Sequence, residues 1–170
     1  LKSCFSCLLF AALTVFGAEN LIINGEFIAD QVDFPPFWEA ANSDHRYCHG
    51  GGPDGRNSLM IMRGTVRQNG LTLVPGEKYH ASGWFRTSGA KAEERITGLT
   101  VASGKWVQST PMLEVPGDTA GKWVFVEGDY TMCDSKDGFN LILWPGKAGG
   151  MIEVSDVKLV ALTERAQAES

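Results

Sequence analysis

One stretch of alternating side chains limits what this chain can fold into. It follows the Pro75-Gly76 pair, which is typical of a tight turn because proline presets φ and glycine accepts a positive φ. Neighbouring side chains on a β-strand point to opposite faces. The pattern therefore places Tyr79, Ala81, Gly83, Phe85 and Thr87 on one face and His80, Ser82, Trp84 and Arg86 on the other. The first face predicts a core, and the second predicts either a covered layer or a binding surface.

The rest of the chain favours further short strands. The 170 residues include 20 glycines and 7 prolines, which suit tight turns, and no helical period extends over a long segment. We expect strands over 20–27, 57–63, 65–73, 123–132, 139–144 and 151–162, and a hairpin formed by 96–102 and 105–108. Residues 30–56 are expected to form a long loop. The sequence thus predicts an all-β, single-domain antiparallel β-sandwich.

The expected strands also define their inward faces. Leu59 and Ile61 should point one way and the two methionines beside them the other. In the later strands we expect Phe139, Leu141, Leu143, Ile152, Val154, Val157 and Leu159 in the core, and Asn140, Ile142 and Trp144 on the opposite face. The polar pair Ser155-Asp156 interrupts the last alternation and predicts an irregularity there.

The first 18 residues have the composition of a signal peptide. Lys2 precedes an apolar run over 7–16, and the small pair Gly17-Ala18 offers a cleavage site. The run is too short to predict a membrane span. We therefore expect a secreted or periplasmic protein with a signal peptide at 1–18, the domain at 19–162 and a polar tail or linker at 163–170.

Cysteines and charge narrow the functional classes. Removal of residues 1–18 leaves Cys48 and Cys133, which form either one disulfide or two free thiols; the predicted pairing is Cys48 with Cys133.

The net charge is −5 and no basic run is present, so nucleic-acid binding is not expected.

Several short motifs occur in an order that resembles carbohydrate-binding modules of families four and nine, within the galactose-binding-domain-like jelly rolls. The motifs are Asn20-Leu-Ile-x-Asn-Gly-x-Phe27, Trp38, Asn57-Ser-Leu, Gln68, Pro75-Gly-x-x-Tyr79, Trp84, Lys122-Trp123 and Ile152-x-x-x-Asp156-Val-x-Leu159. The likeness covers nearly all of residues 19–162. It implies a jelly roll that binds a carbohydrate without catalysis, commonly linked to or associated with a secreted glycoside hydrolase. It also implies structural positions for Trp38 and Trp123.

The resemblance also implies a structural calcium ion between the two ends of the domain. Glu26 and Asp156 are the candidate ligands, because calcium binds hard carboxylate and carbonyl oxygens. This chain departs from the family pattern at Ile28, where members often carry a second acidic residue.

The candidate sugar-binding residues are the polar and aromatic side chains that point away from the expected core. Sugars stack their C–H faces on aromatic rings and receive hydrogen bonds from polar side chains. The candidates are Trp84, Trp144, Arg86, Asn140, His80 and, in the expected hairpin, Trp106. The alternative is that both outward tryptophans are covered by the 30–56 loop and belong to the core.

Catalytic and zinc sites are less well supported. Glu93 and Glu94 are adjacent on an expected loop, whereas glycosidase carboxylates must face each other across a cleft. His45, Cys48 and His49 lack a further Cys/His pair at ligand spacing, so we do not predict zinc. We expect no enzyme. Besides carbohydrate binding, the sequence leaves open a structural or adhesive module that packs against an enzyme or cell-surface partner without binding sugar.

Overall fold

The computed structural model describes residues 19–29, 34–105, 109–145 and 150–162. Its strands are β1 (Glu39–Cys48), β2 (Ser58–Leu71), β3 (Lys78–Ser88), β4 (Arg95–Ser103), β5 (Ser109–Pro116), β6 (Val124–Thr131), β7 (Phe139–Leu143) and β8 (Met151–Ala161), with one 3-10 turn at Pro53–Gly55. The predicted signal peptide, the predicted tail and Trp106 lie outside the described residues. Among the described residues, no helix is long and apolar enough to cross a membrane.

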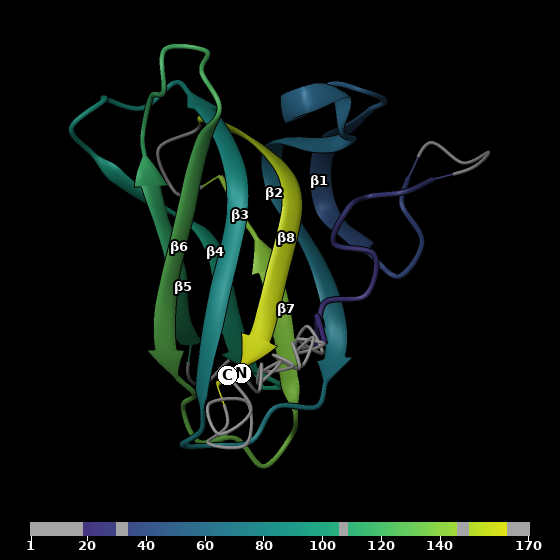
Figure 1. The fold of residues 1–170 in the computed structure, drawn as a ribbon, viewed down its shortest axis with the longest axis vertical. Coiled ribbons are helices and arrows are strands. Elements are labelled where there is room, and N and C mark those ends of the chain that lie inside the picture. Colours follow the sequence, from purple (N-terminus) through teal and green to yellow (C-terminus); the bar gives the residue numbers. More distant parts are fainter. Residues whose placement is uncertain (1–18, 30–33, 106–108, 146–149, 163–170) are drawn as a thin grey trace, which may run out of the picture.

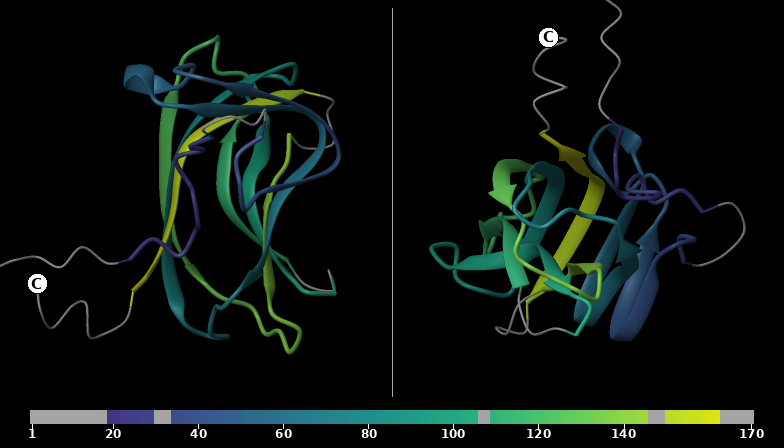
Figure 2. Two further views of the ribbon diagram at one scale, coloured as in Figure 1. Left: turned by 90° about the vertical axis from the view of Figure 1, so that its right-hand side faces the viewer. Right: turned by 90° about the horizontal axis from the view of Figure 1, so that it is seen from below.

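The strands form an antiparallel sandwich whose two layers share β2 (Figure 1). Hydrogen bonding follows the order β5-β4-β7-β2-β8-β3-β6, and β1 pairs along the other edge of β2. Residues 59–61 of β2 pair with β8, whereas residues 66–71 pair with β7. β2 therefore passes from one layer to the other, and Figure 2 shows the two layers facing each other. The predicted all-β sandwich is confirmed.

A bulge in β2 makes this passage possible. Gly64 has φ 75°, and a Cβ there would lie 2.2 Å from the carbonyl oxygen of Asn42 in β1. Only glycine fits such a close approach with a positive φ. Before the bulge the odd-numbered Leu59 and Ile61 are buried, and after it the even-numbered Val66 is. The inward face of β2 is thus preserved while the strand turns from one layer to the other.

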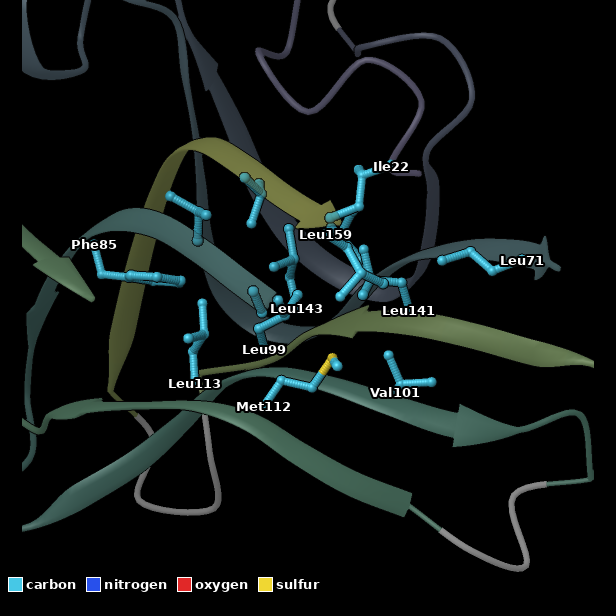
Figure 3. Packing of buried hydrophobic residues seen from close by; sticks show 14 of the residues in the cluster. Ile22, Leu71, Phe85, Leu99, Val101, Met112, Leu113, Leu141, Leu143 and Leu159 are labelled. Carbon is cyan, nitrogen blue, oxygen red and sulfur yellow. The ribbon is translucent and has the colours of Figure 1, made fainter. Parts of the chain in front are cut away.

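The core lies between the layers and follows the predicted alternation. In β3, Tyr79 is 2% exposed and Phe85 is fully buried, while Trp84 between them is half-buried on the other face. The predicted inward residues of β7 and β8 are buried as expected, and Asp156 has φ 50° at the predicted irregularity. Figure 3 shows side chains from both layers meeting in this core, among them Phe85, Leu99, Leu113, Leu141 and Leu159.

The expected strand over 20–27 is wrong, because this segment forms turns. Its asparagine side chains bind backbone groups, both within the segment and in β8, and these bonds favour turns over a sheet ladder. The Asn20 side-chain oxygen accepts from the N–H groups of Ile22 (3.1 Å) and Leu159 (2.9 Å). Trp38, which is 5% exposed, donates its Nε1–H to the carbonyl of Asn24 at 3.0 Å. The segment is pinned to the sandwich, and the predicted structural position of Trp38 is confirmed.

The expectation of a loop over 30–56 is also wrong, because β1 occupies Glu39–Cys48. β1 pairs on one side only, with β2, and its sequence is mostly polar. Edge strands tolerate charged residues on both sides, so they lack the hydrophobic alternation by which a strand is recognised. The hairpin that follows β4 has β5 at Ser109–Pro116 as its second arm, and residues 106–108 of the predicted arm lie outside the described residues.

Candidate functional site

The predicted binding residues come to lie on two opposite outer faces of the sandwich. His80, Trp84 and Arg86 belong to β3 in one layer, whereas Asn140 and Trp144 belong to β7 or its end in the other. The Trp84 face is formed by His80, Ser82, Trp84, Arg86, Phe125, Glu127, Asp129 and Glu153. The Trp144 face is formed by Thr65, Arg67, Asn69, Thr100, Ala102, Asn140, Ile142 and Trp144. The structure therefore does not bring the two outward tryptophans into one site.

On the Trp84 face, two aromatic rings pack against each other across neighbouring strands. Trp84 of β3 is paired directly with Phe125 of β6, and their ring centroids are 5.2 Å apart at an interplanar angle of 54°. Phe125 is 48% exposed, while Trp84 is half-buried. Part of the predicted stacking surface of Trp84 is therefore already covered by another ring of the same domain.

Arg86 on the same face is held by a buried carboxylate. Its Nε donates to Oε2 of Glu153 at 2.9 Å, and its Nη2 donates to the same oxygen. The Glu153 side chain is only 1% exposed, and its other oxygen accepts from the Ser58 hydroxyl at 2.6 Å. The Arg86 guanidinium also lies 4.9 Å from the ring centroid of Trp123. Because a buried carboxylate needs a charged partner, Arg86 has a structural role.

Glu153 was not predicted. It lies on the outward face of β8, where a carboxylate is normally exposed to solvent, and the sequence carries no signal that this one is buried.

The third predicted residue of this face, His80, lies between two exposed carboxylates. Its Nδ1 is 2.7 Å from Asp129 and its Nε2 is 3.4 Å from Glu127. Both ring nitrogens of His80 thus have partners within the domain.

The Trp144 face combines an apolar floor with half-exposed polar groups. Ala102 is 1% exposed and Ile142 is 6% exposed, although both point away from the core cluster. Registers place Ile142 directly between Arg67 of β2 and Thr100 of β4, and Ala102 beside Asn140. Side chains two residues apart on a strand share a face. Asn140 and Trp144 therefore lie on either side of Ile142 along β7.

A single carboxylate orders two donors at the edge of this face. Oε2 of Glu39 in β1 accepts from Nε of Arg67 at 3.3 Å and from Nδ2 of Asn69 at 2.7 Å. The Arg67 side chain is 32% exposed and the Glu39 side chain is 56% exposed. These three residues were not predicted, since Glu39 was assigned to a loop and the strand of Arg67 was read without its neighbours. Together they hold hydrogen-bond donors and an acceptor at the β1–β2 edge of the Trp144 face, next to Ile142.

The candidate calcium ligands lie in one cavity but do not form a calcium cage. Glu26 and Asp156 line a cavity of about 320 Å³ together with Ile28, Gly55, Arg56 and Asn57. Asp156 is already paired with two cations, Arg56 at 3.3 Å and Lys158 at 3.2 Å. Among the described residues, no group of three or more His, Cys, Asp or Glu side chains is arranged to hold a metal ion. The side chains present do not fit a calcium site.

The predicted disulfide does not form in this structure, because Cys48 and Cys133 are both free. Cys48 pairs with Ser58, and the registers through β8 and β3 place that level beside Phe125, near the start of β6. Cys133 follows the far end of β6, roughly 25–30 Å away at the rise of a strand. Bonded cysteines have Cα atoms less than about 7 Å apart. Burial, and then the nearby Glu153 carboxylate, raise the pKa of the Cys48 thiol.

Solved structures that are similar to this chain contain sugar-binding modules. The CBM22-1 xylan-binding domain of Paenibacillus barcinonensis Xyn10C is 16% identical with a TM-score of 0.60, and the match covers 86% of this chain and 96% of that domain. A family 16 carbohydrate-binding module is 17% identical with a TM-score of 0.57, covering 83% and 99% of the two chains. The Clostridium thermocellum xylanase 10B structure, which joins CBM22-1 and GH10 modules and is complexed with xylohexaose, is 14% identical with a TM-score of 0.57.

The match to the xylanase covers 75% of this chain but only 26% of that protein. No protein-family model matches this chain, and no curated protein is similar to it in sequence. At these identities the likeness shows the fold alone. The jelly-roll fold implied by the resemblance is confirmed, with the neighbours being modules of families 22 and 16.

Proposed function

We propose that residues 19–162 form a non-catalytic carbohydrate-binding module that holds a polysaccharide on the Trp144 face. The observation that carries this proposal is the arrangement on that face: it combines a half-buried tryptophan at the end of β7 with an apolar floor and, at the β1–β2 edge, the Glu39–Arg67–Asn69 hydrogen-bonded group. A sugar ring presents two matching kinds of surface, C–H groups on its faces and hydroxyls around its edge.

Each group on the face has a defined contribution. Trp144 stacks on a sugar ring, while the buried side chains of Ile142 and Ala102 form the floor beneath the polar groups. Arg67 and Asn140 donate hydrogen bonds to hydroxyl oxygens, and the free acceptor capacity of Glu39 receives hydroxyl protons. Because Arg67 is partly neutralised by Glu39, the face favours uncharged sugars over acidic ones.

The Trp84 face supports sugar binding less well. Trp84 is paired with Phe125, Arg86 is bound to the buried Glu153, and His80 bridges two carboxylates. A second candidate function uses this face: the exposed Phe125 beside Trp84 suits packing against a partner protein. This is the structural or adhesive alternative. It requires no sugar and leaves the Trp144 face without a role.

The similar solved structures suggest a ligand class and a partner for this domain. The CBM22-1 and CBM22-2 domains of Paenibacillus barcinonensis Xyn10C are both xylan-binding domains, and one neighbour carries a GH10 module on the same chain. We therefore propose a linear, uncharged polysaccharide of the xylan type as the first ligand class, and a linked or associated glycoside hydrolase as partner. The signal-peptide pattern at 1–18 supports a secreted or periplasmic location.

The test is a binding screen of residues 19–162 against xylan, β-glucan, mannan and a uronic-acid polymer, by affinity electrophoresis and then calorimetry. The proposal predicts retention by at least one uncharged polysaccharide and no release of reducing ends. Failure to bind any of the four, together with capture on an immobilised hydrolase from the same source, would favour the adhesive alternative.

A further inference from the structure

We propose that Arg56 is a built-in cation that takes the place of a calcium ion at the junction between the N-terminal segment and β8. The junction is the cavity lined by Glu26, Ile28, Arg56 and Asp156. This inference concerns the stability of the fold and does not depend on the proposed sugar binding.

Asp156 is fixed at this junction by the backbone. It has φ 50° at the irregularity of β8, and its side chain is only 13% exposed. The next residue, Val157, donates its N–H to the carbonyl of Gly25 at 2.9 Å. A Cβ on Gly25 would lie 2.0 Å from the Val157 carbonyl oxygen, so the two chain segments are in direct contact. The Asp156 carboxylate therefore sits where the N-terminal segment crosses β8 and needs a counter-charge there.

The chain supplies that charge itself. Nη1 of Arg56 lies 3.3 Å from Oδ2 of Asp156, and Nζ of Lys158 lies 3.2 Å from Oδ1. Arg56 follows the turn at Pro53–Gly55, where its backbone N–H donates to the Pro53 carbonyl at 3.0 Å. The guanidinium thus connects this turn to β8, next to the N-terminal segment. This is the connecting role that a bound cation would have.

The same arrangement opposes calcium. Calcium requires six to eight oxygen ligands, and charged side chains among the cavity residues offer only the carboxylates of Glu26 and Asp156. Ile28 presents hydrocarbon where a further carboxylate would be needed. Asp156 is already paired with both Arg56 and Lys158, and with Glu26 of the same cavity these four side chains sum to a formal charge of zero. A divalent ion would add two positive charges beside two others.

Thermal unfolding of residues 19–162 in chelator and in millimolar calcium tests the inference. The wild-type protein should melt at the same temperature in both, and calorimetry should detect no calcium binding. Arg56→Gln should lower the melting temperature, whereas Arg63→Gln should not. Arg63 is the matched control because it forms a 3.2 Å ion pair with Asp44 but is 77% exposed.

A double variant reverses the charge pattern of the cavity. Arg56→Gln with Ile28→Asp removes one cation and adds one carboxylate, so its melting temperature should rise with calcium and fall with chelator. A wild-type melting temperature that falls in chelator and recovers with calcium would overturn the inference. Equal melting temperatures for Arg56→Gln and Arg63→Gln would also overturn the inference, because Arg56 would then not stabilise this junction.

Discussion

Arg86 and Glu153 form an ion pair between β3 and β8 in which the guanidinium is 31% exposed and the carboxylate is 1% exposed. The pair lies on the outer face of its layer, where alternation alone predicts solvent. Arg86 binds one oxygen of the Glu153 carboxylate, and Ser58 binds the other. The pair explains why an arginine that resembles a sugar-binding residue in the sequence is part of the scaffold.

Arg86→Ala should destabilise the domain strongly, because it leaves a buried carboxylate without its counter-charge. Loss of one partner of a buried pair typically costs about 3–5 kcal/mol in the free energy of unfolding. Arg86→Ala combined with Glu153→Gln should be less destabilising than the sum of the two single changes. Urea denaturation of all three variants measures this coupling. Strict additivity would show that the two side chains act independently.

Phe85 and Phe125 provide a matched pair on neighbouring strands. Phe85 is fully buried in the core, and Phe125 is 48% exposed on the outer face. Phe85→Ala should therefore cost about 3–5 kcal/mol of unfolding free energy, through lost burial and the cavity it leaves. Phe125→Ala should cost far less, and chemical denaturation compares them directly. Equal losses would contradict the assignment of the two faces.

The cysteines of residues 19–162 should both titrate as free thiols in the denatured, unreduced protein. In the native protein Cys48 should react slowly with iodoacetamide at neutral pH. Burial first, and Glu153 second, raise its pKa, so its thiolate fraction stays low until the pH is well above that of an ordinary cysteine. The alkylation rate should therefore rise late with pH. Rapid alkylation at pH 7 would contradict this.

Glu39→Gln tests whether that carboxylate positions the donors beside it. An exposed pair such as Glu39–Arg67 contributes about 0.2–1 kcal/mol to stability, so the melting temperature should change little. Polysaccharide affinity should fall roughly two- to tenfold, which corresponds to one poorly placed hydrogen bond. The expected result is therefore a reduced polysaccharide affinity with a nearly unchanged melting temperature. Unchanged affinity would show that Glu39 does not position Arg67 or Asn69 for binding.

Alternation predicted the inward residues because a buried face leaves a strong pattern. Tyr79 and Phe85 in β3, and Val154 and Val157 on either side of the irregularity in β8, were all recovered from the sequence in this way. β1 was missed because an edge strand needs no hydrophobic alternation. The segment over 20–27 resembles a strand in the sequence because it is apolar, and the sequence does not reveal that the Asn20 side chain bonds to the backbone of Ile22 and Leu159.

The candidate site could be predicted only by residue type. The sequence identified outward residues such as Trp84 and Trp144. Alternation tells which face of its strand a residue occupies, but it does not tell which layer of the sandwich the strand joins. That depends on β2, which changes partners at Gly64. The ion pairs of Arg86 and Arg67 likewise require strand order, since their partners lie 67 and 28 residues away.

Affinity electrophoresis of Trp144→Ala and Trp84→Ala, on the polysaccharide that retains the wild-type domain, tests the central claim most directly. Thermal melting first establishes that each variant is folded, and Arg67→Ala serves as a second change on the Trp144 face. The account predicts that Trp144→Ala weakens retention at least about 30-fold, as loss of an energetically dominant contact does. Arg67→Ala should weaken it as well, and Trp84→Ala should leave it unchanged. Lost retention in folded Trp84→Ala, with full retention in Trp144→Ala and Arg67→Ala, would contradict the account and place the sugar on the Trp84 face.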